Sequence, residues 1–411
     1  MFDALEPRAA DPLLDVIRQF RADPRPNKLD LGVGVFQDEH GRTPVLRSVK
    51  KAERILLETQ ETKTYLGAEG DVEYARTLGA LALGELAGDA RTVALQAPGG
   101  TGALRLGAEL IRLANPATQV WLGRPTWPNH EPIFSAVGLA LCDYRHFDPA
   151  TQAVCFDELM AAMRAARSGD VFALHASCHN PTGADFSLAQ WREIARALSE
   201  RRLIPFLDTA YQGFAHGLDE DMAGARLVLG EVPEALVAVS CSKNFGLYRE
   251  RTGALFVRAN DAAKAEAART NLMGIARANY SMPPDHGAAI VRAILQDAGL
   301  RAEWQAEVAD MRTKLRRLRE SLAQLQINSL DLSRLADQNG MFATLPLTKG
   351  QIARLKDEHA IYVVPSGRVN IAGLMAADLD HFAAALRAVL IDAARETESR
   401  SIGAQKPCSV H

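Results

Sequence analysis

Five side chains suited to chemistry follow four short apolar runs of the sequence. At or just beyond the ends of these runs come Trp127, Asn180, Asp208 with Tyr211, and Lys243. Ligands of open α/β sheets bind beyond the carboxyl ends of the strands, so residues at these positions meet at one edge of a sheet. The sequence therefore predicts a pocket that combines an aromatic ring, an amide, a carboxylate, a phenol and an amine.

This set of side chains suits pyridoxal phosphate. A lysine held in a partly desolvated pocket beside cations has a lowered pKa and can form a Schiff base with a carbonyl group. A buried carboxylate such as Asp208 needs a cationic partner, which a pyridinium nitrogen would supply. Trp127 could stack on the ring, while Tyr211 and Asn180 could form hydrogen bonds with a ring oxygen. Lys243 would be the reactive amine.

A glycine-rich segment, residues 97–103, could hold the phosphate. It opens an apolar helix expected over Ala103–Leu113, whose positive end would present free backbone N–H groups. The segment lacks the Gly-Lys-Ser/Thr of a Walker loop and the third glycine of a dinucleotide fingerprint. Ser240 and Arg251, which flank Lys243, could add a hydroxyl and a guanidinium to the same phosphate.

The elements that must position these residues follow from the apolar pattern. Between about residues 92 and 260, short apolar runs alternate with helical patterns, which predicts a mainly parallel sheet with crossover helices. The expected strands are Val120–Gly123, Val171–Ala176, Ile204–Asp208, Leu236–Ser240 and Ala254–Val257.

After about residue 300 the pattern changes to that of a long helix. Apolar residues from Trp304 to Leu325 step by four and three, which predicts a helix leading into a smaller α+β domain. Strands over Met341–Leu345 and Ile361–Pro365 and a final helix near Asp378–Ala394 would complete that domain. We therefore expect a large domain over residues 41–300, a small domain over 301–395 that residues 1–40 join, and a frayed tail over 396–411.

Composition limits the class of protein. With 411 residues, 47% of them hydrophobic and 24% charged, the chain is an ordinary globular one, and its net charge of −3 gives no footprint for nucleic acid or an anionic membrane. No apolar stretch reaches the ~18 residues of a membrane span, and the acidic N-terminus lacks the basic start of a signal peptide. The five cysteines form an odd, irregularly spaced set, so we expect reduced thiols and a cytoplasmic location.

Several segments distributed along the chain carry a family resemblance. They are Leu31–Val35, Thr64–Tyr65, Gly99–Leu104, Thr126–Trp127, His179–Gly183, Asp208–Phe214, Ser240–Tyr248 and Ser366–Asn370. Together they resemble the class I aspartate/aromatic aminotransferases, in order, from about residue 5 to residue 395. The resemblance implies the type I pyridoxal phosphate-dependent transferase fold, an α/β fold with a mainly parallel seven-stranded sheet in its large domain. It also implies a homodimer whose active sites lie at the subunit boundary.

By this resemblance, Lys243, Asp208 and Tyr211 are the catalytic residues. Lys243 would bind the cofactor covalently and carry the proton, and Asp208 would pair with the pyridine nitrogen. The other cofactor-binding residues would be Gly100, Thr101, Trp127, Asn180, Ser240, Arg251 and, from the neighbouring subunit, Tyr65.

The resemblance also implies a substrate site. Arg368 would clamp the α-carboxylate, a bidentate task suited to a guanidinium, and Arg277 would reach across the dimer to a side-chain carboxylate. Gly34, Trp127 and Asn180 would also contact the substrate. His130 and His175 would orient Asp208.

The implied activity is transfer of an amino group between an L-amino acid and 2-oxoglutarate by a ping-pong mechanism. The amino acid would be aspartate or an aromatic one, tyrosine or phenylalanine, and the preference stays open because Arg277 could swing away for an aromatic ring. A lyase or decarboxylase on the same cofactor is the alternative enzyme, and a non-catalytic ligand-sensing relative is the alternative outside catalysis. The presence of both substrate arginines favours transamination.

Each residue taken alone has a plainer interpretation. Asp208 could be a helix cap, the glycine run a turn, and the arginines members of surface ion pairs. His175, Cys178 and His179 could suggest zinc, but strand alternation points them in different directions and no second His/Cys pair lies nearby in sequence, so we expect no metal site. The resemblance further implies a cis Asn180–Pro181 bond.

Overall fold

A seven-stranded sheet forms the centre of the protein, whose computed structural model describes residues 1–7, 12–327 and 330–390. The strand order is β2-β10-β9-β8-β7-β3-β4, in which β10 runs antiparallel to both of its neighbours and the remaining pairs are parallel. The strands are β2 Thr92–Pro98, β3 Gln119–Arg124, β4 Ala140–Arg145, β7 Val171–His175, β8 Ile204–Thr209, β9 Ala235–Ser240 and β10 Thr252–Arg258. The expected mainly parallel sheet is confirmed.

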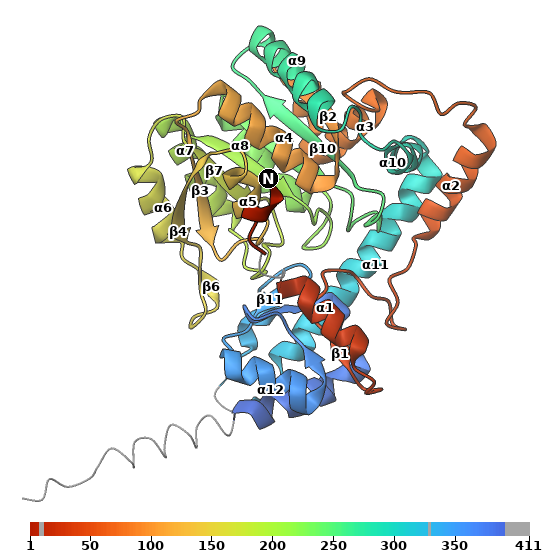
Figure 1. The fold of residues 1–411 in the computed structure, drawn as a ribbon, viewed down its shortest axis with the longest axis vertical. Helices are drawn as coiled ribbons and strands as arrows, with labels where there is room; N and C mark the ends of the chain where they lie inside the picture. Colours follow the sequence, from red (N-terminus) through yellow and green to blue (C-terminus); the bar gives the residue numbers. More distant parts are fainter. Residues whose placement is uncertain (8–11, 328–329, 391–411) are drawn as a thin grey trace, which may run out of the picture.

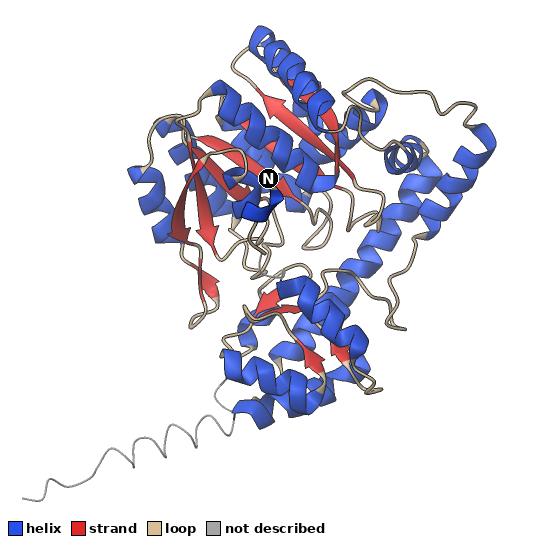
Figure 2. Cartoon of the chain, in the orientation of Figure 1, coloured by secondary structure: helices blue, strands red, loops and turns tan. Residues whose placement is uncertain are grey.

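Helices pack on both faces of this sheet, as Figures 1 and 2 show. One face is covered by α4 (Gly99–Ala114), α5 (His130–Ser135) and α9 (Ala262–Asn279). The other is covered by α3 (Val72–Leu83), α6 (Phe156–Ala165), α7 (Leu188–Arg201), α8 (Ala223–Glu231) and α10 (His286–Gln296). Outside these layers lie α1 (Pro12–Ala22), α2 (Arg47–Thr59), α11 (Ala298–Ala323) and α12 (Lys349–His359).

The central strands read as continuous apolar runs because both of their faces are covered. Every residue of β7, β9 and β10 is buried. Successive side chains point to opposite faces, so Phe206 packs in the core beneath α4 while Leu207 packs in the core beneath α7. This alternation determines which side chains of each strand point to which face of the sheet.

A separate apolar core forms from the two ends of the chain. There β1 (Leu29–Asp30) pairs with β12 (Ile361–Tyr362), and β11 (Phe342–Thr344) pairs with β13 (Arg368–Asn370). Helix α11 connects the cores, because Trp304 packs against the large sheet whereas Leu322 packs in this separate core. Figure 1 shows α1, β1 and α12 gathered at the lower end of α11. The domain bounds themselves stay a prediction.

Some sequence-based bounds were wrong. Strands β2 and β4 were missed, α4 begins at Gly99 instead of Ala103, and α11 ends at Ala323, before Leu325. Strands β11 and β12 are shorter than expected, since they end at Thr344 and Tyr362. The final helix occupies residues 379–390, and its expected end and the tail over 396–411 lie outside the described residues.

The Asn180–Pro181 bond is cis, as expected. In the part of the chain that the structure describes, no helix combines the length and the apolar character needed to cross a membrane.

Candidate active site

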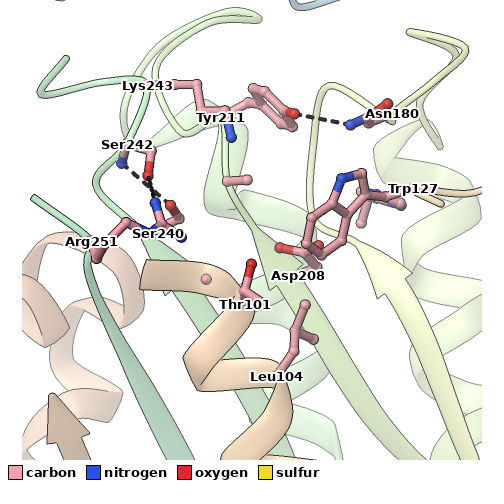
Figure 3. Close-up of a pocket in the computed structure, with 13 residues that line it drawn as sticks. Thr101, Leu104, Trp127, Asn180, Asp208, Tyr211, Ser240, Ser242, Lys243 and Arg251 are labelled. Atoms are coloured by element: carbon pink, nitrogen blue, oxygen red, sulfur yellow. Dashed lines mark hydrogen bonds between the residues drawn. The ribbon is translucent and has the colours of Figure 1, made fainter. Parts of the chain in front are cut away.

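A cavity of about 510 Å³, its open mouth included, lies at the carboxyl edge of the sheet. Most of the predicted site residues line it, namely Gly100, Thr101, Trp127, His175, Asn180, Asp208, Tyr211, Ser240, Lys243 and Arg251. Figure 3 shows these side chains converging from several strand ends and from the first turn of α4. Three further lining residues, Leu104, Ala210 and Ser242, were not predicted as site residues.

Lys243 follows β9 and is half-buried in this cavity. Its Nζ atom lies 5.2 Å from the centre of the Tyr211 ring. Removal from water lowers the pKa of Lys243 to about 8, with Asp208 opposing this shift and the cations Arg251 and Arg368 adding to it. A larger fraction of this amine is therefore in its neutral, nucleophilic form near neutral pH than of an exposed lysine.

Asp208 lies in β8, where it is buried and bound to a histidine. Its Oδ2 lies 3.0 Å from Nε2 of His130, and Nδ1 of the same ring lies 2.8 Å from Oγ1 of Thr126. Burial alone would raise the pKa of Asp208, but the hydrogen bond with His130, together with the positive charge of Lys243, outweighs burial and the pKa is lowered. Asp208 therefore offers a fixed negative charge to a cationic ligand atom.

Tyr211 and Asn180 form the upper wall of the cavity in Figure 3. The Nδ2 group of Asn180 donates a hydrogen bond of 3.1 Å to the Tyr211 hydroxyl. Burial raises the pKa of Tyr211, so the phenol stays protonated and can donate to a ligand. The buried Oδ1 of Asn180 lacks a hydrogen-bond partner among the described residues.

The first turn of α4 forms a cradle for an anion. No side chain caps this helix end, so its first N–H groups stay available. Gly99 has a φ of +69°, and a Cβ there would lie 2.6 Å from Nη2 of Arg251. A Cβ on Gly100 would lie 3.1 Å from Cβ of Ser240. Only glycine leaves room for an oxyanion to reach these N–H groups, Ser240 and Arg251 together.

Ser242 is a site residue that the sequence argument missed. Its hydroxyl accepts a hydrogen bond of 3.4 Å from Nη1 of Arg251, and so holds the guanidinium beside the cradle. The signal was present, because Ser242 directly precedes Lys243 in a segment already singled out.

A row of histidine rings runs from Asp208 into the protein. Ring centres are 5.1 Å apart for His130 and His175, 4.4 Å for His175 and His179, and 3.9 Å for His179 and His146. Burial lowers the pKa of His175 to about 3, with the neighbouring His130 adding to the shift. His175 is therefore a neutral neighbour of the Asp208–His130 pair.

The residues suggested as zinc ligands, His175, Cys178 and His179, do not come together as one ligand set. Among the described residues, the side chains close enough to share a metal are His130, His175 and Asp208, without Cys178 or His179. Both ring nitrogens of His130 already contact Thr126 and Asp208, which is the arrangement of a residue that orients Asp208.

The predicted substrate residues divide into two groups. Arg368 is buried, donates from Nη2 to the Gly32 carbonyl at 2.7 Å, and lies 4.5 Å from the Phe342 ring. Gly34 faces the same ring, since a Cβ there would lie 2.9 Å from it. Neither Arg368 nor Gly34 is among the residues that line the 510 Å³ cavity. Arg277, and Tyr65 from the predicted cofactor site, are exposed and do not line it either.

Pyridoxal phosphate fits what these residues offer. Its phosphate matches the uncapped helix end, its cationic ring nitrogen matches Asp208, its ring oxygen matches the Tyr211–Asn180 pair, and its aldehyde matches the amine of Lys243. The fold and this cavity together define a type I pyridoxal phosphate-dependent enzyme.

Comparisons with known proteins show to which family of pyridoxal phosphate-dependent enzymes this chain belongs. The model of the family "Aminotransferase class I and II" matches residues 26–386. The tyrosine aminotransferase of Rhizobium meliloti (strain 1021) is 54% identical over 92% of this chain and 97% of that protein, and the aspartate aminotransferase of Escherichia coli (strain K12) is 44% identical over 95% and 100%. The crystal structure of the aromatic-amino-acid aminotransferase from Burkholderia pseudomallei, covalently bound to pyridoxal phosphate, superimposes with a TM-score of 0.92 at 40% identity, over 95% of this chain and 99% of that one. The chain belongs to the class I and II aminotransferase family and is a pyridoxal phosphate-dependent aminotransferase.

Proposed function

We propose that this enzyme transfers the amino group of aspartate or of an aromatic amino acid to 2-oxoglutarate by a ping-pong mechanism. The observation that carries the proposal is the placement of Lys243, with its pKa of about 8, in one cavity with the ionised Asp208. The relatives support both substrate groups, since they include tyrosine, aromatic-amino-acid and aspartate aminotransferases.

Each side chain has a task in this reaction. The bound cofactor supplies an electron sink that stabilises negative charge at Cα of the amino acid. Asp208 holds positive charge at the ring nitrogen, Tyr211 donates a hydrogen bond, and Trp127 packs on the ring face. Nζ of Lys243 accepts the Cα proton and returns a proton during amino transfer, which a pKa near neutral pH permits.

Arg368 would bind the α-carboxylate of the substrate. Its guanidinium is buried and fixed by Gly32 and Phe342, so its remaining donors are oriented before a substrate arrives. The Nε group has no hydrogen-bond partner among the described residues, and a carboxylate would supply one.

We further infer a homodimer in which each cavity is completed by Tyr65 and Arg277 of the partner chain. Tyr65 is 89% exposed, and the segment around it exposes Leu57 (84%) and Val72 (61%) as well. An interface with a second chain would cover these exposed apolar side chains. Arg277 is also exposed, with Nη1 bound only to Ser281 Oγ at 3.0 Å among the described residues. Sedimentation should give twice the chain mass of 44.6 kDa, and a monomer at micromolar concentration would contradict the shared site.

We also propose a division into two domains and a cytoplasmic location. The separate core at the lower end of α11 supports a small unit of residues 1–40 and 301–395 beside a large unit of 41–300. The free thiols of Cys178 and Cys241 within the core support a cytoplasmic location, which cell fractionation would test.

The reaction class is tested by the products. Aspartate, tyrosine and phenylalanine would each be supplied with 2-oxoglutarate, and glutamate and the matching oxo acid should form in equal amounts. An amino acid supplied alone should yield about one oxo acid per site, because the first half of a ping-pong reaction needs no acceptor. Lys243→Ala should abolish both, whereas the exposed Lys264→Ala should retain them. Release of ammonia or carbon dioxide without glutamate would indicate a lyase or decarboxylase instead.

A further inference from the structure

A second cavity lies between the two cores, apart from the active site. Its volume is about 850 Å³ with its open mouth, and it shares no lining residue with the first cavity. Its walls are the loop Phe214–His216, one face of α11 and residues 336–340. Figure 1 shows α11 passing from the large sheet to the separate core, so an occupant of this cavity would contact segments of both.

Three arginines of α11 line this cavity. Arg312, Arg316 and Arg319 are spaced by four and three residues and therefore share one face of the helix. Within the described part of the chain, none of them has a carboxylate oxygen within the 4.0 Å of an ion pair. Three positive charges thus lie along one wall without direct neutralisation.

Arg319 is the innermost of the three. It is 2% exposed, and it donates hydrogen bonds to the carbonyl oxygens of Gly340 at 3.1 Å and Asn339 at 2.8 Å. The carbonyl oxygens of Leu335 and Phe342 accept from the same guanidinium, so backbone carbonyls satisfy most of its donors. They leave its charge in place, and the negative charge of Asp185 acts on Arg319 without forming an ion pair. A buried charge with so little compensation is costly, and an anion in the cavity would reduce that cost.

Arg312 and Arg316 keep most of their donors available. Among the described residues, Arg312 donates from Nη1 to the Gly213 carbonyl at 2.8 Å, and Arg316 donates from Nη2 to the Ala215 carbonyl at 3.3 Å. A guanidinium has five N–H donors in a planar fork that matches phosphate and carboxylate. These single contacts orient both forks at the cavity wall.

Two carboxylates also line the cavity, and both are exposed. Asp337 forms an ion pair of 3.3 Å with Arg334, whereas Glu320 has no ion pair among the described residues. The three arginines therefore outnumber the carboxylates, and Glu320 opposes an anion at the mouth.

We propose that this cavity binds a compact polyvalent oxyanion, held by the free donors of Arg312 and Arg316, with the buried charge of Arg319 behind them. Guanidinium groups bind phosphate and carboxylate oxygens through the same bidentate contacts, so both kinds of polyanion share the required chemistry. The bound anion would link the loop after Tyr211 to the segment before Phe342. Those two aromatic rings contact each other, with centres 6.1 Å apart, so the anion would contact the two segments that carry this ring pair.

The test is calorimetric titration of the cofactor-loaded enzyme, whose phosphate cradle is then occupied. Pyrophosphate represents phosphate-based anions and citrate represents carboxylate-based ones, each at the same low ionic strength. We expect at least one probe to bind at one site per chain. Arg316→Gln should weaken binding about tenfold or more, and Glu320→Gln should strengthen it, because it removes the opposing charge.

The matched control is Arg317→Gln. Arg317 is the next residue of α11, is exposed and does not line the cavity, so its loss removes the same charge from the same helix and should change affinity less than twofold. Tighter binding of pyrophosphate identifies a phosphate ligand, and tighter binding of citrate a polycarboxylate. The proposal is overturned if neither probe saturates, or if Arg316→Gln and Arg317→Gln weaken binding equally, which would indicate only a diffuse surface charge.

Discussion

Replacing Lys243 with methionine should stabilise the cofactor-free protein at neutral pH. Burial lowers the pKa of this amine from 10.5 to about 8, so the folded chain holds its charged form less favourably than the unfolded chain does. At roughly 1.36 kcal/mol per pH unit, that difference corresponds to about 3 kcal/mol of lost stability. Methionine has a similar length and no charge to desolvate, so the variant should regain most of this amount.

The effect should decrease as the pH rises. Between pH 8 and 10.5 the unfolded chain binds more protons at this position than the folded chain, so the wild-type protein gains stability with pH. By this linkage the advantage of Lys243→Met should fall from about 3 kcal/mol at pH 7 to roughly 1.5 kcal/mol at pH 9.5. The direction is opposite to that of a lysine stabilised by an ion pair.

Urea unfolding of the cofactor-free protein at both pH values would measure this difference. Protein concentration must be matched, because association of chains adds to apparent stability. Lys264→Met, at an exposed position of α9, serves as the control and should show no such trend. If the advantage of Lys243→Met is absent at pH 7, or is equal at the two pH values, Lys243 is not held in a desolvated pocket and the argument for its nucleophilic form fails.

Three further predictions concern the assembled enzyme. Asp208→Asn should keep the cofactor but lose about 10²–10³-fold in kcat, because an amide cannot hold positive charge at the ring nitrogen; near-normal turnover would show that Asp208 is only structural. Arg277→Ala should reduce kcat/KM for aspartate by an amount equivalent to roughly 2–5 kcal/mol and affect phenylalanine far less, whereas equal losses would argue for a structural role. Mixing inactive Lys243→Ala and Arg277→Ala chains should restore about a quarter of the wild-type aspartate activity, because half of the dimers are mixed and each has one intact site. Demonstrated subunit exchange without recovery would exclude the shared site.

The cavity residues could be predicted because their positions depend on a simple rule. Asn180, Asp208 and Lys243 come just after buried strands, and the carboxyl ends of parallel strands share one edge. Arg251 lies at the same edge although it comes before a strand instead of after one. It precedes β10, which is antiparallel, so its start lies at the same edge.

Other features depend on contacts that the local sequence does not encode. Strand β4 lies at the sheet edge, where only one of its six residues, Tyr144, is buried and two, Asp143 and Arg145, are charged, so it lacks the continuous apolar run of a central strand. The run Gly99–Gly102 has low helix propensity, yet it forms the first turn of α4. Its glycines are explained by crowding from Arg251, Ser240 and Pro98, which the local sequence pattern does not show. His146 stacks on His179, which is more than thirty residues away in the sequence. No motif near His146 predicts that contact. The roles of Tyr65 and Arg277 depend on a second chain and stay predictions.

The spread of the cavity residues along the chain links folding to cofactor supply. Its lining extends from Gly100 to Arg251, and these residues meet only when strands distant in sequence have paired. A ligand that binds only the folded chain stabilises it, by about 4 kcal/mol when its concentration is a thousand times its Kd. A chain that ends before Arg251 would lack that residue and strand β10, which joins β2 to the rest of the sheet, and it should not retain the cofactor. The supply of pyridoxal phosphate should therefore influence how long this enzyme survives proteolysis, because the cofactor binds and stabilises only chains whose sheet is complete.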